Sequence, residues 1–191
     1  AQLDKAQALV VAGEPVAALP LLEGIVRRSP DDGAANLLLG QALLQSGQTR
    51  AAVPPLTRGA GSERHAGMAG LLLASVHLIE GRAERALEVT YRVLATHPGQ
   101  PASLRIRPTS HLQLARHEEA AADARRLLEV APEDPQAPVL LGTALTRLGR
   151  LDEAEDVLTQ LEQEAQAGEA PGAHARACTA LASFLAAGRQ E

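Results

Sequence analysis

The chain has 191 residues, of which 46% are apolar and 1% aromatic, and its net charge at pH 7 is -5. This acidic balance argues against a nucleic-acid partner, which usually needs a basic face. Cys178 is the only cysteine, so the sequence excludes an internal disulfide and a cysteine-rich metal site. No apolar run approaches the ~18 residues of a membrane-spanning helix, so we expect no direct membrane insertion.

The apolar residues are mainly alanine and leucine, which are strong helix formers. Valine and isoleucine never alternate with polar residues in the way that a β-strand requires. The composition therefore predicts an all-α fold.

One pattern recurs every 34 residues, without insertions, along most of the chain. An alanine marks each period, a glycine or alanine precedes it by five residues, and a mostly small residue precedes it by twelve. These three sets are Ala18, Ala52, Ala86, Ala120 and Ala154; Gly13, Gly47, Gly81, Ala115 and Gly149; and Ala6, Gly40, Ala74, Pro108 and Gly142. Such regularity predicts five copies of one structural unit.

Each unit is predicted to be a pair of antiparallel helices. The small residue of the first helix allows the second helix to approach closely, and the glycine ends the first helix. A proline at the end of the unit, as at Pro30, Pro98 and Pro132, ends the second helix. Helices of about 12 to 14 residues are marginal alone, so neighbouring units are expected to bury one another's faces.

This pattern resembles the tetratricopeptide repeat, over about residues 1–166. The fullest matches are Leu39, Gly40, Leu43, Gly47 and Ala52, and Leu141, Gly142, Leu145, Gly149 and Ala154. The resemblance implies a right-handed superhelical solenoid of antiparallel helix pairs. We predict a single array over residues 1–191, with repeats at about 1–32, 33–66, 67–100, 101–134 and 135–168. Residues 171–187 are expected to form a capping helix or part of a sixth repeat.

Two places depart from the pattern. Pro108 cannot donate a hydrogen bond to the carbonyl of Leu104, so we expect the first helix of the fourth repeat to kink or to restart there. That distortion is either a tolerated irregularity or a bend that shapes a binding groove. In the second repeat, Gly59 and Gly61 are expected to end the second helix early.

The sequence predicts no catalytic or metal site. His77 and His111 lie one period apart, but two ligands without a cysteine or a well-placed carboxylate fall short of a zinc site. We interpret the six histidines as semi-buried packing residues and Cys178 as a packing residue of the cap. Nucleophile elbows, phosphate-binding loops and dinucleotide fingerprints are lacking, so we expect neither an enzyme nor a cofactor.

The resemblance also implies a binding surface, because first helices of this family line a concave groove that binds extended or helical peptides. The corresponding residues here are Leu37, Gln41, Leu44 and Gln45; Leu71, Ser75, Leu78 and Ile79; Arg105, Thr109, Leu112 and Gln113; and Val139, Thr143, Thr146 and Arg147. Within each repeat they are three to four residues apart and therefore share a helix face.

These side chains suit a peptide ligand. Leu44, Leu71 and Leu78 form an apolar strip, the glutamines and threonines offer hydrogen bonds, and Arg105 and Arg147 are suited to acidic groups. Packing between repeats is the alternative role for the apolar ones. Some family members clamp a C-terminal carboxylate with lysines and asparagines, but only Lys5 and Asn36 are present here. A clamp of that kind is not expected.

The predicted function is a protein–protein interaction scaffold that binds a peptide segment of a partner in the groove. Two alternatives stay open: the repeat region of a larger bacterial-type enzyme, such as a sulfotransferase or hydroxylase, and a self-assembling repeat protein. The chain begins at Ala1 without an initiator methionine. A cytoplasmic location is favoured, with a periplasmic one if a signal peptide was removed.

Overall fold

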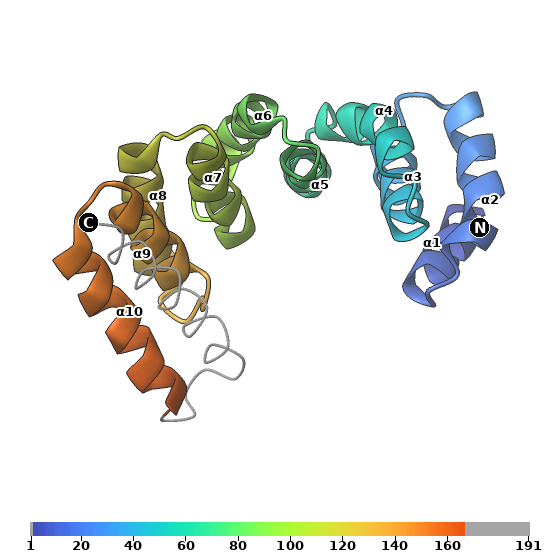
Figure 1. The fold of residues 1–191 in the computed structure, drawn as a ribbon. Helices are drawn as coiled ribbons and strands as arrows, with labels where there is room; N and C mark the ends of the chain where they lie inside the picture. Colours follow the sequence, from blue (N-terminus) through green and yellow to red (C-terminus); the bar gives the residue numbers. More distant parts are fainter. Residues whose placement is uncertain (1, 167–191) are drawn as a thin grey trace. The chain divides into compact units, whose positions relative to one another are not determined.

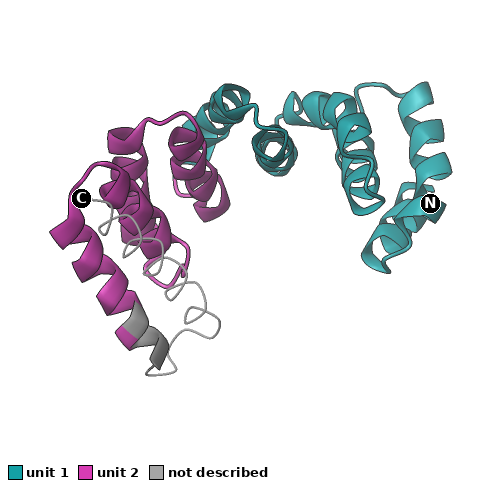
Figure 2. Ribbon diagram, viewed as in Figure 1, with its two compact units in different colours: residues 1–98 teal, residues 99–191 magenta. Residues whose placement is uncertain are grey.

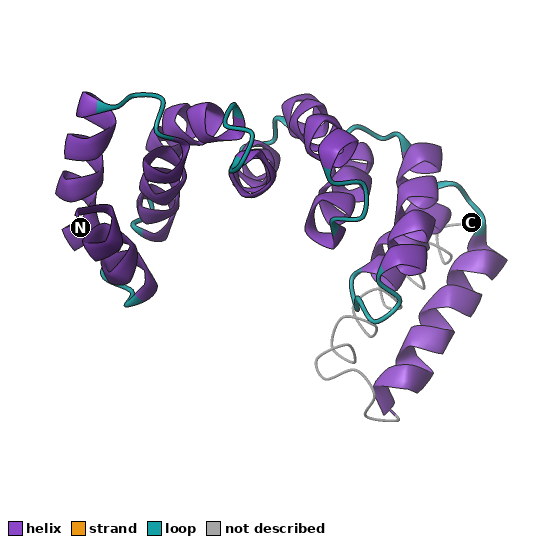
Figure 3. Ribbon diagram, turned by 180° about the vertical axis from the view of Figure 1, so that it is seen from behind, coloured by secondary structure: helices purple, strands orange, loops and turns teal. Residues whose placement is uncertain are grey.

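The described part of the chain is helical throughout. The computed structural model describes residues 2–166, so the predicted capping segment at 171–187 lies outside the described residues. Every regular element in that range is a helix (Figure 3), which confirms the all-α prediction. The helices are α1 (Gln2–Val11), α2 (Pro15–Arg28), α3 (Gly33–Gln45), α4 (Thr49–Ala60), α5 (Ala66–Ile79), α6 (Ala83–Thr96), α7 (Pro101–Gln113), α8 (His117–Val130), α9 (Ala137–Arg147) and α10 (Leu151–Gln166) (Figure 1).

The chain divides into two compact units, residues 1–98 and residues 99–191 (Figure 2). Helices α1 to α6 belong to the first unit and helices α7 to α10 to the second. Within each unit every helix packs against the next one along the chain. The first helices of successive pairs also touch, α1 with α3, α3 with α5, and α7 with α9. A single array over residues 1–191 stays a prediction.

The periodic alanines form the centre of each helix pair. All five, from Ala18 to Ala154, are fully buried in the second helices. The small positions opposite are equally crowded: a Cβ atom on Gly40 would lie 2.4 Å from Leu56 Cδ2, and one on Gly142 would lie 2.7 Å from Leu158 Cδ2. The close approach predicted at the small positions is therefore real at these two glycines.

The first helix of each pair ends in the same left-handed turn. The φ angle is positive at Gly13, Gly47, Gly81 and Gly149, between 71° and 78°, as a glycine C-cap requires. The next residue donates its N–H to the carbonyl five residues back, as from Gln48 to Leu43 over 2.8 Å. In the fourth pair the turn is held by Ala115 at a φ of 56°. The prediction that this position ends the first helix is confirmed.

The two expected irregularities have different outcomes. Of the two distortions expected at Pro108, the restart is wrong, because α7 runs without a break from Pro101 to Gln113, and the kink stays a prediction. Pro108 is almost fully buried at the small position of its repeat, so tertiary packing holds the helix through the residue that local rules disfavour. The early end of the second helix in repeat two is confirmed. Helix α4 stops at Ala60. Helices α2 and α6 end at Arg28 and Thr96, which is two residues later in the 34-residue period.

Candidate binding faces

Eight of the predicted groove residues lie on the first helices α3 and α5 of the first unit. Leu37, Gln41 and Leu44 are half-buried, and so are most of their counterparts on α5, whereas Gln45 and Ile79 are exposed. The neighbouring Leu43, by contrast, is a core residue. We call this surface the α3–α5 face; it comprises Leu37, Gln41, Leu44, Gln45, Leu71, Ser75, Leu78 and Ile79.

The two helices that carry this face have no charged residue. Neither Gly33–Gln45 nor Ala66–Ile79 contains Asp, Glu, Lys or Arg. Their only titratable side chain is His77, which is 6% exposed. Burial lowers the pKa of His77, and the positive charges of Arg82 and Arg85 lower it further, which favours the neutral ring.

The other eight predicted groove residues lie on α7 and α9 of the second unit. We call this surface the α7–α9 face; it comprises Arg105, Thr109, Leu112, Gln113, Val139, Thr143, Thr146 and Arg147. Each of its threonine hydroxyls donates to a carbonyl one turn earlier in its own helix, as from Thr143 to Val139 over 2.7 Å. Since each donor is used within the helix, these oxygens are suited to accept N–H groups from a ligand.

The two predicted arginines of this face differ. Nε of Arg105 lies 3.0 Å from Oδ2 of Asp134, a residue in the loop before α9. The other carboxylate oxygen of Asp134 accepts the backbone N–H of Gln136 over 2.9 Å. Arg105 therefore helps to join α7 to the next helix pair, while Arg147 is an exposed residue at the end of α9.

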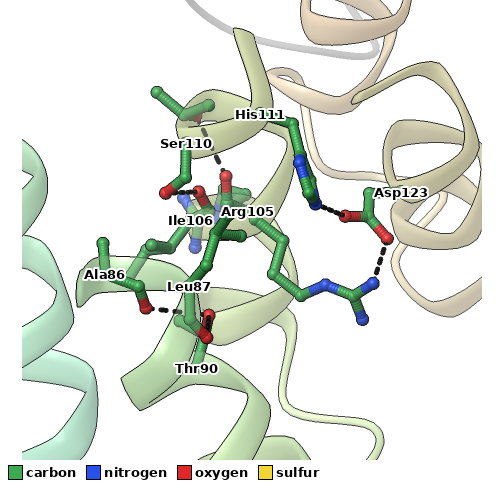
Figure 4. A network of polar contacts seen from close by, with 10 residues as sticks. Ala86, Leu87, Thr90, Arg105, Ile106, Ser110, His111 and Asp123 are labelled. Carbon is green, nitrogen blue, oxygen red and sulfur yellow. Dashed lines mark hydrogen bonds and ion pairs between the residues drawn. The ribbon is translucent and has the colours of Figure 1, made fainter. Parts of the chain in front are cut away.

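A buried polar network was missed by the sequence analysis. Asp123 on α8 is 6% exposed and lies between Arg107 and His111 of α7. Its Oδ1 contacts Nη2 of Arg107 at 2.5 Å and its Oδ2 lies 3.4 Å from Nε2 of His111, so the ring faces the carboxylate (Figure 4). The same view shows hydroxyl bonds within single helices, such as that from Ser110 to the Ile106 carbonyl.

Burial dominates the electrostatics of this network. It raises the pKa of Asp123, an effect that the charge of Arg107 opposes. It lowers the pKa of His111, an effect that the charge of Asp123 opposes. Both shifts favour neutral forms, so the network depends on Arg107 to keep the carboxylate charged.

Comparison along the 34-residue period shows how unusual the network is. The positions of Arg107, His111 and Asp123 are apolar in most other pairs. The equivalent residues are Lys5, Leu9 and Leu21; Leu39, Leu43 and Pro55; Leu73, His77 and Val89; and Leu141, Leu145 and Val157. The polar residues at these otherwise mostly apolar positions are the signal that could have identified the network from the sequence.

Comparison with known families agrees with the helix pairs and their period. Profiles described as tetratricopeptide repeat match residues 9–74 and residues 109–173. The chain is a tetratricopeptide repeat protein. Comparison with curated protein sequences gives no significant match.

Solved structures similar to this tetratricopeptide repeat protein share its fold. One is a MamA protein that is 17% identical, with a TM-score of 0.80 over 88% of this chain and 92% of the other. Another, MamA 41-end from Desulfovibrio magneticus RS-1, is 19% identical, with a TM-score of 0.80 over 87% and 94%. A tetratricopeptide repeat protein from Parabacteroides merdae ATCC 43184 is 21% identical, with a TM-score of 0.79 over 97% and 75%.

The histidines of the tetratricopeptide repeat protein only partly fit the predicted packing role. His77 and His111 are buried and His65 and His117 are half-buried, as expected, but His97 is exposed because it follows the last turn of α6. His174 and Cys178 lie outside the described residues. Within residues 2–166 no group of three or more His, Cys, Asp or Glu is arranged to hold a metal ion. No helix of that range is long and apolar enough to span a membrane.

Proposed function

We propose that this chain is a protein-interaction scaffold that binds a peptide segment of a partner on the faces of its first helices. Membership of the tetratricopeptide repeat family supports an interaction role. The observation that carries the peptide proposal is the α3–α5 face, where large aliphatic side chains such as Leu44 and Leu71 stay half-exposed beside a fully buried core. Apolar surface of this kind gains stability when a partner covers it.

The polar side chains of the two faces supply the orientation that apolar contacts lack. The amides of Gln41 and Gln45 offer both donors and acceptors to a peptide backbone. Thr143 and Thr146 offer acceptors, because their hydrogens are used within α9. Arg147 is exposed beside them and suits a carboxylate of the ligand. Each face, taken by itself, thus offers a peptide hydrogen-bonding groups without requiring any catalytic group.

Selection from a displayed library of random peptides on the immobilised chain tests the proposal. We expect enriched peptides to bind the wild type and to lose affinity for either of two face variants. One variant carries Gln41→Ala with Leu44→Ala on α3, and the other carries Thr143→Ala with Arg147→Ala on α9. The matched control, Glu84→Ala with Arg92→Ala, changes two exposed residues of the second helix α6 and should bind normally.

Two results would contradict peptide binding. One is a selection that enriches no peptide over the empty support. The other is enriched peptides that bind all variants equally, with circular dichroism showing each variant folded. Light scattering over a concentration series would then test self-assembly, and the sequence of the complete reading frame would test the larger-enzyme alternative.

A further inference from the structure

Two of the three first helices of the first unit, α3 and α5, carry no charged residue, whereas α1 carries Asp4 and Lys5. Helices α3 and α5 together contain no Asp, Glu, Lys or Arg, although the chain as a whole is 21% charged. The second helices beside them do carry charge, such as Arg50 and Arg58 on α4 and Glu88 on α6. Solvent-facing sides of helices usually carry charged or polar residues. The half-exposed side of α3 and α5 carries polar residues, but none of them is charged.

Acidic residues that flank α3 and α5 have partners within the protein. Glu80 follows the last residue of α5, and its carboxylate pairs with Arg82 and lies 3.7 Å from Nε of Arg50. At the other end of α3, one carboxylate oxygen of Asp32 accepts the backbone N–H of Ala35 over 3.0 Å. Both acids are thus engaged by groups of the chain itself.

We infer that the α3–α5 face binds a partner segment whose contacting residues are uncharged and mainly aliphatic. This inference rests on the proposed function and names the class of its ligand. A charged side chain placed against Leu44 and Leu71 would lose water without gaining an opposite charge, which is costly. An aliphatic side chain there would gain the full benefit of burial.

Hydrogen bonds at this face fit the same ligand. Gln41 and Gln45 on α3 and Ser75 on α5 are its polar members, and none carries charge. The Ser75 hydroxyl donates to the Leu71 carbonyl over 2.9 Å, so it is suited to accept from a peptide N–H. The buried His77 adds no charge near neutral pH, because its pKa is lowered. The face therefore pairs neutral polar groups with aliphatic ones.

Three fluorescent peptides of about 16 residues, long enough for four helical turns, test the inference by fluorescence anisotropy. The first contains only Leu, Ala and Gln, with leucines three and four residues apart. In the second, two of the leucines are replaced by Glu, and in the third by Lys. We expect the first peptide to bind. Each charged peptide should bind at least about tenfold more weakly, because its charge would be buried without an opposite charge.

A matched pair of protein variants locates the binding. Gln41→Glu adds a negative charge to the α3–α5 face, and Gln48→Glu makes the same change at an exposed residue outside it. We expect Gln41→Glu to weaken binding of the uncharged peptide about tenfold and to improve the affinity of the lysine peptide relative to it. Gln48→Glu should change neither affinity. Binding of the uncharged peptide should change little between about 0.05 M and 0.5 M salt.

Several outcomes would overturn the inference. The inference fails if the charged peptides bind as well as the uncharged one. It also fails if the two variants have equal effects, or if the uncharged peptide does not bind. Self-association that Gln41→Glu abolishes, without peptide binding, would make the face an interface between copies of the chain. If library selection instead yields charged peptides that depend on the α3–α5 face, peptide binding stands and only the inferred chemistry fails.

Discussion

Asp123 of α8 forms an ion pair with Arg107 of α7 at two positions that are Val157 and Leu141 in the last helix pair. Asp123 is 6% exposed, so its charge is stabilised chiefly by Arg107 and not by water. In a low-dielectric setting the attraction between two charges is strong, but removing both from water is costly. We therefore expect the intact pair to add little net stability, and the loss of one member alone to be destabilising.

Removing one member should be more harmful than replacing the whole network. We expect Arg107→Leu alone to lower the free energy of unfolding by about 3 kcal/mol, because it leaves the Asp123 charge buried without its partner. Replacing Arg107 and His111 by Leu and Asp123 by Val, as in the last pair, should be neutral or stabilising by about 1 kcal/mol or more. Urea unfolding followed by circular dichroism measures both, and equal losses in the two variants would contradict this account.

His77 should make the protein less stable as the pH falls. Its pKa in the folded state is lowered from 6.5, so the unfolded chain binds a proton at a pH where the folded chain does not. The stability contributed by the neutral ring is complete above about pH 6.5 and is lost as the pH falls below that value. His77→Leu, which restores the residue found at Leu43 and Leu145, should reduce this loss.

Urea unfolding of wild type and His77→Leu at about pH 8 and pH 5 measures the effect, since the two values lie on either side of the ordinary histidine pKa. The matched control is His97→Gln, a change at an exposed histidine of the same unit. If His77→Leu keeps the full pH dependence of the wild type, burial of His77 does not cause it.

The helix pairs could be predicted because the features that define them are local and repeat. Gly47 ends a helix by its own backbone conformation, and the buried Ala52 recurs at a fixed distance from it. The same logic places the half-buried residues of the α3–α5 face, since positions three to four apart on one helix share a side. Even Ala115 was found by its place in the period, although its side chain gives no such signal alone.

Rules applied to one helix at a time do not reveal which charged residues turn inward; only the comparison of equivalent repeat positions points to Arg107 and Asp123. Arg107 and Asp123 lie on different helices, and a charged residue in a helix is usually assumed to face solvent. The partner of Arg105 is Asp134 in a loop, at a distance along the chain that no helical spacing fixes. Pro108 shows the opposite limit: a reliable local rule predicts a break, but packing around a buried ring keeps α7 continuous.

Ala115 should be replaceable by glycine with a gain in stability. It holds a φ of 56°, in a region that residues with a Cβ atom adopt at a cost and that glycine adopts freely. We expect Ala115→Gly to raise the free energy of unfolding by about 0.5 to 1 kcal/mol. The reverse change, Gly149→Ala, at a φ of 74°, should lower it by about 1 kcal/mol in the same urea titration. A loss of stability in Ala115→Gly, or a gain in Gly149→Ala, would contradict the view that both residues hold the same left-handed turn.

One substitution should have opposite effects at two helical glycines. A Cβ atom on Gly40 would lie 2.4 Å from Leu56 Cδ2, so Gly40→Ala must push α3 and α4 apart or displace a buried leucine. We expect a loss of about 1 to 3 kcal/mol, typical of overpacking. On Gly24 of α2 the nearest atom to such a Cβ is Arg28 Nη1 at 3.9 Å.

With that space available, Gly24→Ala should gain about 0.5 to 1 kcal/mol, because alanine loses less backbone entropy than glycine on folding into a helix. Thermal and urea unfolding of the two single variants compare the same chemical change in a crowded and an open position. If both variants are stabilised, the pair α3–α4 adjusts to an extra methyl group, and close approach at Gly40 does not explain why that position is small.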